Sequence, residues 1–155
     1  MTGFSFHDTA DVLDGILSRH PEVDVVQIQL NYLDWDNEII QSRACWEVCR
    51  KHGKPVIVME PVKGGTLANI PEAAEKLFEG EPPAHRANRL AASREGVALV
   101  LSGMSTLEQM DENTAFMASF QPLTESETLV LKTAAEIIRS AVAVPCTGCS
   151  YCTEG

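Results

Sequence analysis

Three cysteines near the end of the sequence have the residue type and the spacing to hold a metal cluster. Cys146, Cys149 and Cys152 follow one another at intervals of three residues in the segment PCTGCSYC. This spacing lets one loop supply three thiolate corners of a 4Fe–4S cluster while its backbone amides face the sulfurs. A fourth cysteine of such a run would fall just past the last residue of the sequence. We therefore expect an iron–sulfur segment in the intact protein, with a zinc knuckle or an unligated tail as alternatives.

Two further cysteines suggest packing rather than chemistry. Cys45 and Cys49 are four residues apart, which places them on one face of a predicted helix, beside Trp46. Two thiols at this spacing could bind a metal, but a free cysteine usually behaves as a small buried hydrophobe. We interpret both as core residues.

Two glutamines share one face of a predicted strand, residues 23–30. Side chains alternate along a strand, so Val26 and Ile28 point to one face while Gln27 and Gln29 point to the other. Buried amides need hydrogen-bonding partners. We interpret Gln27 as a ligand contact, whereas Gln29 could equally bond to neighbouring strands.

Glycine-rich loops follow two more predicted strands, residues 56–59 and 97–101. The first loop contains Lys63-Gly64-Gly65 and the second contains Gly103-Met104-Ser105. Each resembles a phosphate-binding loop that leads into a helix N-terminus, although glycines in a tight turn are weak evidence alone. His7, after the first predicted strand, is more often a capping or core histidine than a catalyst.

The elements that must position these residues alternate between short strands and amphipathic helices, which is typical of a parallel α/β sheet. Strands are expected at residues 3–6, 23–30, 56–59 and 97–101. The helices are expected from an Asp8 cap to Pro21, from Asn37 to His52 with Gly53 as the C-terminal glycine, from Pro71, over 84–94, from a capping box at Ser105–Glu108 to Phe120, and over 125–142.

Four βα units are half of the number that closes a parallel (β/α)8 TIM-type barrel, which takes roughly 250 residues. Half of a barrel leaves two open strand edges, which are a liability in an isolated chain. We therefore predict an α/β fold that represents a fragment of a larger barrel. A flavodoxin-like open sheet is the alternative.

Composition excludes several classes of function. The 155 residues include 12 basic and 22 acidic side chains, a net charge of −10, which argues against binding the phosphate backbone of nucleic acids. No apolar run approaches the roughly 20 residues that span a bilayer. The N-terminus lacks the pattern of a signal peptide. We expect a cytoplasmic protein with no nucleic-acid or membrane partner.

Five segments carry a resemblance to a known family: GFSFHD, VDVVQIQLNYLDWD, GKPVIVMEPVKGGTLA, LSGMSTLEQMDEN and PCTGCSYC. The chain resembles the C-terminal half of the aldo/keto reductase family, in the branch with a C-terminal ferredoxin-like 4Fe–4S domain. The resemblance implies that residues 1–122 are the second half of a barrel. It also implies that residues 123–155 are a helix and a truncated ferredoxin-like segment.

The resemblance further implies a binding site for NAD(P). Ser5 and Gln27 match residues that hold the nicotinamide carboxamide, and Glu112 and Asn113 match the pair that contacts adenine. Phe6 replaces the asparagine that follows the serine in relatives.

Three loop residues, Lys63, Gly103 and Ser105, complete the predicted cofactor contacts. Gly103 and Gln109 stand where relatives that prefer NADPH carry Lys and Arg. Without those cations, a preference for NADPH is not supported.

The family's catalytic Asp, Tyr, Lys and His tetrad belongs to the half of the barrel that the matching segments do not cover, so no catalytic residue is assigned here. We expect part of an NAD(P)-dependent oxidoreductase that acts on a small-molecule carbonyl or alcohol, with a flavin or a redox partner protein able to intervene. The alternatives are a non-catalytic iron–sulfur electron-transfer or binding module and a structural half-barrel that dimerises.

Overall fold

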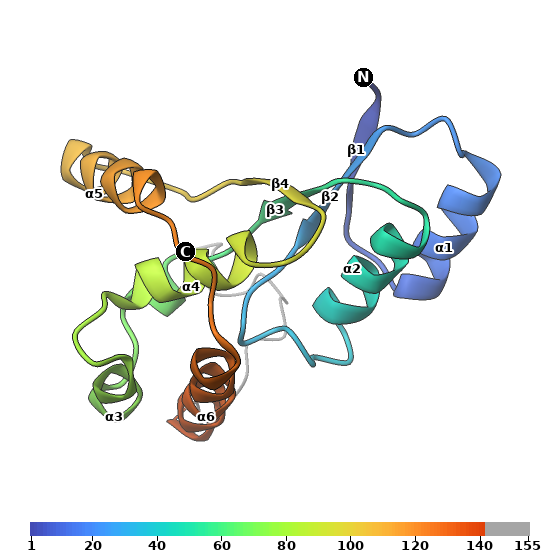
Figure 1. Ribbon diagram of the computed structural model, residues 1–155. Helices are drawn as coiled ribbons and strands as arrows, with labels where there is room; N and C mark the ends of the chain where they lie inside the picture. Colours follow the sequence, from blue (N-terminus) through green and yellow to red (C-terminus); the bar gives the residue numbers. More distant parts are fainter. Residues whose placement is uncertain (142–155) are drawn as a thin grey trace, which may run out of the picture.

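The computed structural model describes residues 1–141, which form a four-stranded parallel sheet covered by helices (Figure 1). The strands are β1 (Gly3–Phe6), β2 (Val25–Gln29), β3 (Val56–Met59) and β4 (Val97–Val100). Their order in the sheet is the order in the chain, β1-β2-β3-β4. This order is that of successive barrel strands, whereas a flavodoxin-like sheet reverses direction at a switch point.

Five helices of at least ten residues connect or follow the strands: α1 (Ala10–Arg19), α2 (Ser42–Lys51), α4 (Pro83–Ala92), α5 (Leu107–Ala118) and α6 (Glu125–Ala141). The β3–α4 connection contains three short turns of helix, η1 (Thr66–Ala68), α3 (Glu72–Glu75) and η2 (Lys76–Phe78). None of the helices within residues 1–141 has the length and apolar character needed to span a membrane.

The two faces of β2 differ as the sequence predicts. Val26 and Ile28 are 0% and 2% exposed and belong to the core beneath the helices, whereas Gln27 and Gln29 are only half-buried on the opposite face. β1 and β2 are in continuous register, with Ser5 opposite Gln27, whereas the register between β3 and β4 shifts by one residue after Val56. The polar side chains of β1 and β2 therefore share the face of the sheet that the helices leave uncovered.

Helix α2 packs its two cysteines inward, which confirms the interpretation of both as core residues. Cys45 and Cys49 are buried and free. Burial raises the pKa of the Cys45 thiol to about 11 and that of Cys49 to about 12. The helix ends at Lys51, and its C-cap His52 is followed by Gly53 with φ +63°, the left-handed conformation that glycine adopts at low cost.

Two predicted helix starts are wrong. Helix α1 begins after Thr9, and Asp8 only accepts a hydrogen bond from the Thr9 amide (2.7 Å). Helix α2 begins at Ser42 instead of Asn37. Asn37 caps only a turn, in which its Oδ1 accepts hydrogen bonds from the amides of residues 39 and 40 (2.8 and 2.9 Å). Gln41 then adopts the left-handed conformation (φ +54°), which separates this turn from the helix.

The predicted capping box of α5 is displaced by one residue. Thr106, not Ser105, is the N-cap, and its hydroxyl accepts a hydrogen bond from the Gln109 amide (3.2 Å). Gln109 in turn accepts one from the Ser105 amide through Oε1 (2.8 Å). Helix α5 contributes no buried residue, and its Leu107 is 78% exposed.

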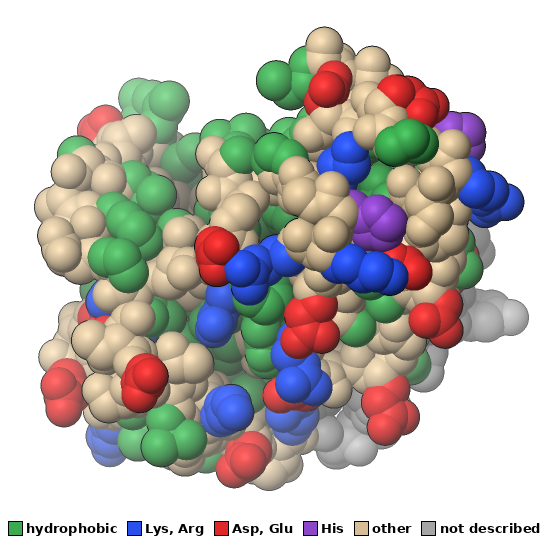
Figure 2. Space-filling view, turned by 45° about the vertical axis from the view of Figure 1, so that its right-hand side comes forward, with side chains coloured by type: hydrophobic (Ala, Val, Ile, Leu, Met, Phe, Trp, Pro, Cys, Tyr) green, Lys and Arg blue, Asp and Glu red, His purple; other side chains and the backbone are tan. Residues whose placement is uncertain are grey.

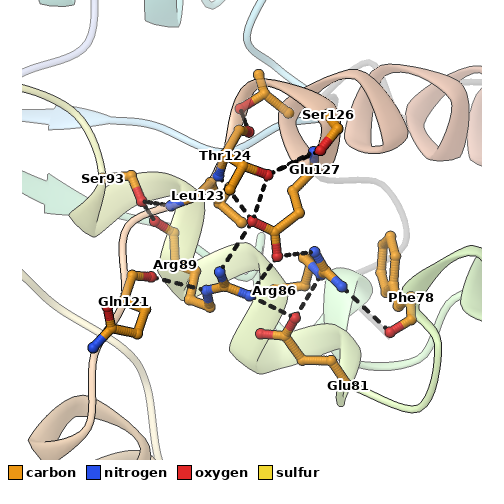
Figure 3. A network of polar contacts seen from close by, with 11 residues as sticks. Phe78, Glu81, Arg86, Arg89, Ser93, Gln121, Leu123, Thr124, Ser126 and Glu127 are labelled. Atoms are coloured by element: carbon orange, nitrogen blue, oxygen red, sulfur yellow. Dashed lines mark hydrogen bonds and ion pairs between the residues drawn. The ribbon is translucent and has the colours of Figure 1, made fainter.

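An ionic network joins α4 to α6 (Figure 3). The guanidinium groups of Arg86 and Arg89 both reach Glu81, at 2.7 and 2.8 Å, and both reach Glu127, at 2.9 and 3.0 Å. Thr124 and Glu127 also form a capping box, because each side chain accepts a hydrogen bond from the other residue's amide (3.2 and 2.8 Å). This network attaches α6 to the sheet-covering layer.

The face formed by α1 and α2 carries charges of both signs, interleaved (Figure 2). Asp14 on α1 accepts hydrogen bonds from Lys51 (2.8 Å) and His52 (2.6 Å) at the end of α2. These bonds, first to Lys51 and then to His52, lower the pKa of the Asp14 carboxyl. The charges on this face therefore pair with one another.

Candidate functional site

A cleft of about 340 Å³ lies at the carboxyl end of β3 and β4. In parallel α/β folds, this edge of the sheet is where ligands bind. The cleft is formed by the loop after β3, the first turn of α4, the loop after β4 and one side of α5. Its lining consists of Glu60, Pro61, Val62, Gly64, Gly65, Ala68, Pro82, Ala84, His85, Leu101, Ser102, Gly103, Ser105, Gln109, Glu112 and Asn113.

Four of the residues singled out in the sequence meet in this cleft: Gly103, Ser105, Glu112 and Asn113. Asn113 is half-buried, with its amide nitrogen 3.5 Å from the Ser102 hydroxyl. A Cβ atom added to Gly103 would meet nothing within 4 Å, so the backbone there borders open space. The cleft therefore presents carboxylate, amide and hydroxyl groups beside an unobstructed glycine.

Lys63, a fifth predicted contact, does not line the cleft. Its ammonium group lies 2.7 Å from both carboxylate oxygens of Asp34, a side chain that is almost fully buried. The glycines that follow it lead into the three-residue turn η1, too short to present the helix N-terminus expected there. Gly64 and Gly65 nevertheless line the cleft.

The Lys63–Asp34 pair belongs to a cluster that fixes the loop after β3. Asn31 donates a hydrogen bond from Nδ2 to the Glu60 carbonyl (3.1 Å) and another to Asp34 (2.9 Å). Gln29 also donates to Asp34 (2.7 Å), so its amide has a partner within the protein. Glu60 and Lys63 both have positive φ, +55° and +49°, which costs a residue other than glycine roughly 1–2 kcal/mol. The cluster offsets this strain and holds the loop at the edge of the cleft.

Ser5 and Gln27 lie on the uncovered face of the sheet and are not among the residues that line the cleft. Gln27 donates to the Met59 sulfur from Nε2 (3.4 Å). A thioether is a weak acceptor, and the Gln27 oxygen accepts no hydrogen bond within the described residues, so most of the amide's bonding capacity is free.

The cleft is acidic. Glu60 and Glu112 are exposed carboxylates in its lining, and no lysine or arginine of residues 1–141 is among the lining residues. His85 is the one histidine among the lining residues within the described part of the chain. Its ring stacks on Phe116 of α5, with centroids 4.5 Å apart and planes at 11°.

Sequence reasoning missed His85 and Asp34. The signal for His85 was Pro82-Pro83, since proline at a helix start places the next residues in the first turn, at the edge of the sheet. The signal for Asp34 was an acid three residues after Asn31 in an otherwise apolar segment.

The predicted cluster ligands Cys146, Cys149 and Cys152 lie outside the described residues. Within residues 1–141, no group of three or more His, Cys, Asp or Glu side chains is arranged to hold a metal ion.

Comparison with known proteins places this architecture in a family. The Aldo/keto reductase family profile matches residues 1–136. No curated protein matches the chain.

Solved structures share the fold. The holo form of an aldo-keto reductase from Bacillus halodurans has a TM-score of 0.64 and 19% identity over 85% of this chain and 49% of that chain. An aldo-keto reductase from Klebsiella pneumoniae in complex with NADPH also has a TM-score of 0.64, with 15% identity over 94% of this chain and 51% of that one. The chain thus spans about half the length of these structures. With the profile covering nearly the whole described fold, the chain belongs to the aldo/keto reductase family.

Proposed function

We propose that the chain forms the dinucleotide-binding half of an aldo/keto reductase-type oxidoreductase, with residues 1–122 as the half-barrel and residues 123–155 leading into an iron–sulfur segment. The observation that carries this proposal is the cleft at the carboxyl edge of β3 and β4. It gathers Gly103, Ser105, Glu112 and Asn113, which are four of the seven residues expected to contact NAD(P).

The residues present fit a dinucleotide at two places. In the cleft, Glu112 and Asn113 would accept from and donate to an adenine edge, and the open space beside Gly103 gives the ribose and phosphates access to backbone amides. On the uncovered sheet face, Ser5 and Gln27 would hydrogen-bond a carboxamide, for which the weakly engaged Gln27 amide has free capacity.

A bound nicotinamide would supply hydride transfer, and this chain's residues would orient the ring and leave the proton to other groups. Lys63 would act indirectly, since its contact with Asp34 fixes the loop beside the cleft. The acidic lining disfavours the extra phosphate of NADPH, so we expect no preference for NADPH over NADH.

The proposal is tested by titrating the purified chain with NADH and NADPH while following binding calorimetrically. Glu112→Ala and Asn113→Ala should each weaken binding about tenfold, which corresponds to 1.4 kcal/mol. Glu108→Ala is the matched control, because Glu108 lies on the same helix and does not line the cleft. Absence of binding, or an equal loss in the control, would contradict the nucleotide site.

The iron–sulfur part of the proposal rests on the donor set alone. Three thiolates at Cys146, Cys149 and Cys152 suit three corners of a 4Fe–4S cluster. Anaerobic reconstitution with iron and sulfide, in a chain extended by a fourth cysteine, should give charge-transfer absorbance at about 400 nm. Cys149→Ser should abolish this absorbance. Tight binding of one zinc ion without sulfide uptake would favour the zinc alternative.

The same measurements separate the remaining candidates. Iron uptake without nucleotide binding would favour an electron-transfer or binding module that serves a redox partner protein, whereas a dimer without any cofactor would favour a structural half-barrel. The substrate of the intact oxidoreductase is proposed to be a small-molecule carbonyl or alcohol. We expect the isolated chain to show no carbonyl reduction, because general acid catalysis alone contributes about 10²–10⁴ in rate and no residue here is assigned that role.

A further inference from the structure

A second cleft, of about 110 Å³, lies away from the proposed nucleotide site, where the loop after β2 meets α4 and α6. Its apolar lining includes Trp35, Leu90 and Leu131, and two of its polar lining residues are Tyr32 and Arg94. The proposed function uses none of these residues.

Two polar groups that line this cleft are buried without a partner among residues 1–141. Tyr32 is 5% exposed, and its hydroxyl makes no hydrogen bond within this part of the chain. The Arg94 Nε atom is likewise buried and has no hydrogen-bond partner there. Buried polar groups are normally satisfied, so two unsatisfied donors on one cleft indicate a missing acceptor.

Arg94 also lacks a counterion within residues 1–141, since no carboxylate of this part lies within 4.0 Å of its nitrogens. Its guanidinium carbon stacks 4.5 Å from the centroid of the Trp35 ring. Arg50 stacks in a similar way on Trp46, at 5.2 Å, yet it also pairs with Glu95. Arg94 therefore differs from Arg50 in having no anionic partner among residues 1–141.

The other charged groups at this cleft do not supply Arg94 with an anionic partner. Arg139 lines it and donates to the Leu33 carbonyl (2.6 Å), and Lys132 adds a second cation. Of the two acids in the lining, Asp36 is paired with Arg43 (3.0 Å) on the side of α2, and Glu136 is exposed.

We propose that this cleft binds a short aliphatic carboxylate. The planar guanidinium of Arg94 matches the two oxygens of a carboxylate, and the Tyr32 hydroxyl supplies a further donor. The leucine and tryptophan surfaces of the lining favour a short alkyl chain over a fully hydrated anion such as phosphate. The site needs neither the nucleotide nor the cysteine segment.

The test titrates the full chain with butyrate and follows both tryptophan fluorescence and the thermal midpoint. Butyramide, the neutral isostere, and inorganic phosphate are the control ligands. We expect saturable binding of butyrate, no effect of butyramide and weaker binding of phosphate. Ligand binding to the native state alone raises the midpoint with concentration.

Variants assign the effect to the cleft. Arg94→Gln should weaken butyrate binding at least tenfold, whereas Arg50→Gln, at the other stacked arginine, should leave it unchanged. Tyr32→Phe should weaken binding several-fold without lowering the thermal midpoint of the ligand-free chain, because the lost hydroxyl has no hydrogen-bond partner among residues 1–141. A purely structural role for Tyr32 would lower that midpoint instead.

Equal binding of butyrate and butyramide, tighter binding of phosphate, or wild-type affinity in Arg94→Gln would each overturn the proposal. If Arg94→Gln fails to fold, Arg94→Lys retains the charge and removes the planar fork. It should then bind butyrate more weakly than the wild type, and unchanged affinity in this variant would also overturn the assignment.

Discussion

Several charged side chains of this protein form ion pairs that connect segments distant in the chain. Lys63 illustrates this, because the loop sequence places it at a ligand-binding edge while Asp34, 29 residues earlier in the chain, takes its ammonium group. Removing one partner of a buried pair leaves the other charge without compensation, which costs more than the pair contributes.

We expect Lys63→Met to lower the free energy of unfolding by about 2–3 kcal/mol, since it leaves the Asp34 carboxylate buried without its cation. Lys76→Met is the control, because the Lys76–Glu72 pair on the surface should contribute less than about 0.5 kcal/mol. Urea denaturation measures both. Equal and small losses of stability in the two variants would show that the Lys63–Asp34 ion pair does not stabilise the loop.

Glu127 should make stability depend on pH. Hydrogen bonds, first from the Thr124 amide and then from the Thr124 hydroxyl and Arg89, lower the pKa of the Glu127 carboxyl from 4.5 to about 2. The stabilisation is therefore complete above pH 4.5 and lost as the pH falls toward 2. For a side chain 28% exposed, solvent screening reduces the expected loss to about 1–2 kcal/mol.

The measurement is the free energy of unfolding between pH 6 and pH 2. Glu127→Gln should flatten the acid limb of the curve, whereas Glu125→Gln, at an exposed position of the same turn, should leave it unchanged. An acid limb that persists in Glu127→Gln would mean that other carboxylates govern acid unfolding.

At the scale of elements, alternation along β2 identified its two faces correctly, because a period of two depends only on local geometry. Helix starts were harder to predict. Helix α2 starts only after Gln41, whose φ is positive, and the N-cap of α5 is Thr106 rather than the neighbouring Ser105. The glycine at the end of α2 was predictable, since few other residues tolerate its positive φ.

The candidate site likewise contains residues that could be predicted from the sequence and residues that could not. Glu112 and Asn113 were predicted only because the segment that contains them resembles the family, and the structure places both on α5 in the lining of the cleft. Lys63 and His85 could not be placed from the sequence, because their surroundings depend on residues distant in the chain, Asp34 and Phe116. Tertiary contacts decide whether a side chain at the sheet edge faces the cleft.

The face assignment of β2 leads to a matched pair of substitutions. Val26→Ala should lower the free energy of unfolding by about 2 kcal/mol, since Val26 is fully buried beneath the helices. Val25→Ala, one residue earlier and on the uncovered face, should cost less than about 1 kcal/mol. Chemical denaturation of the two variants tests this, and the reverse order would mean that the register is displaced by one residue.

At the scale of the whole molecule, apolar side chains gather around β4 and α5 without cover. Leu99 and Leu101 are 51% and 43% exposed, and on α5 Leu107, Met110 and Met117 are 78%, 49% and 41% exposed. Exposed apolar side chains that gather on one part of a protein often mark a contact with other protein. The chain spans about half the length of the solved structures that share its fold.

We expect the native chain to bind an environment-sensitive dye such as anilinonaphthalene sulfonate at this surface. Leu99→Lys should lower the dye fluorescence at least twofold. Leu129→Lys, at an isolated exposed leucine on α6 (64% exposed), should change it little. Equal signals from wild type and Leu99→Lys would show that the dye binds elsewhere.

The two buried thiols of α2 can be used to measure how often the native structure opens locally. Alkylating reagents attack the thiolate, and Cys45 and Cys49 are both enclosed and held in the thiol form at neutral pH. Cys49 is 0% exposed, so its modification must wait until α2 separates from the sheet, whereas Cys45 also lines a cleft of about 130 Å³. The rate at which Cys49 is alkylated, measured by mass spectrometry of its peptide, accordingly reports how often these two layers separate while the rest of the chain stays folded.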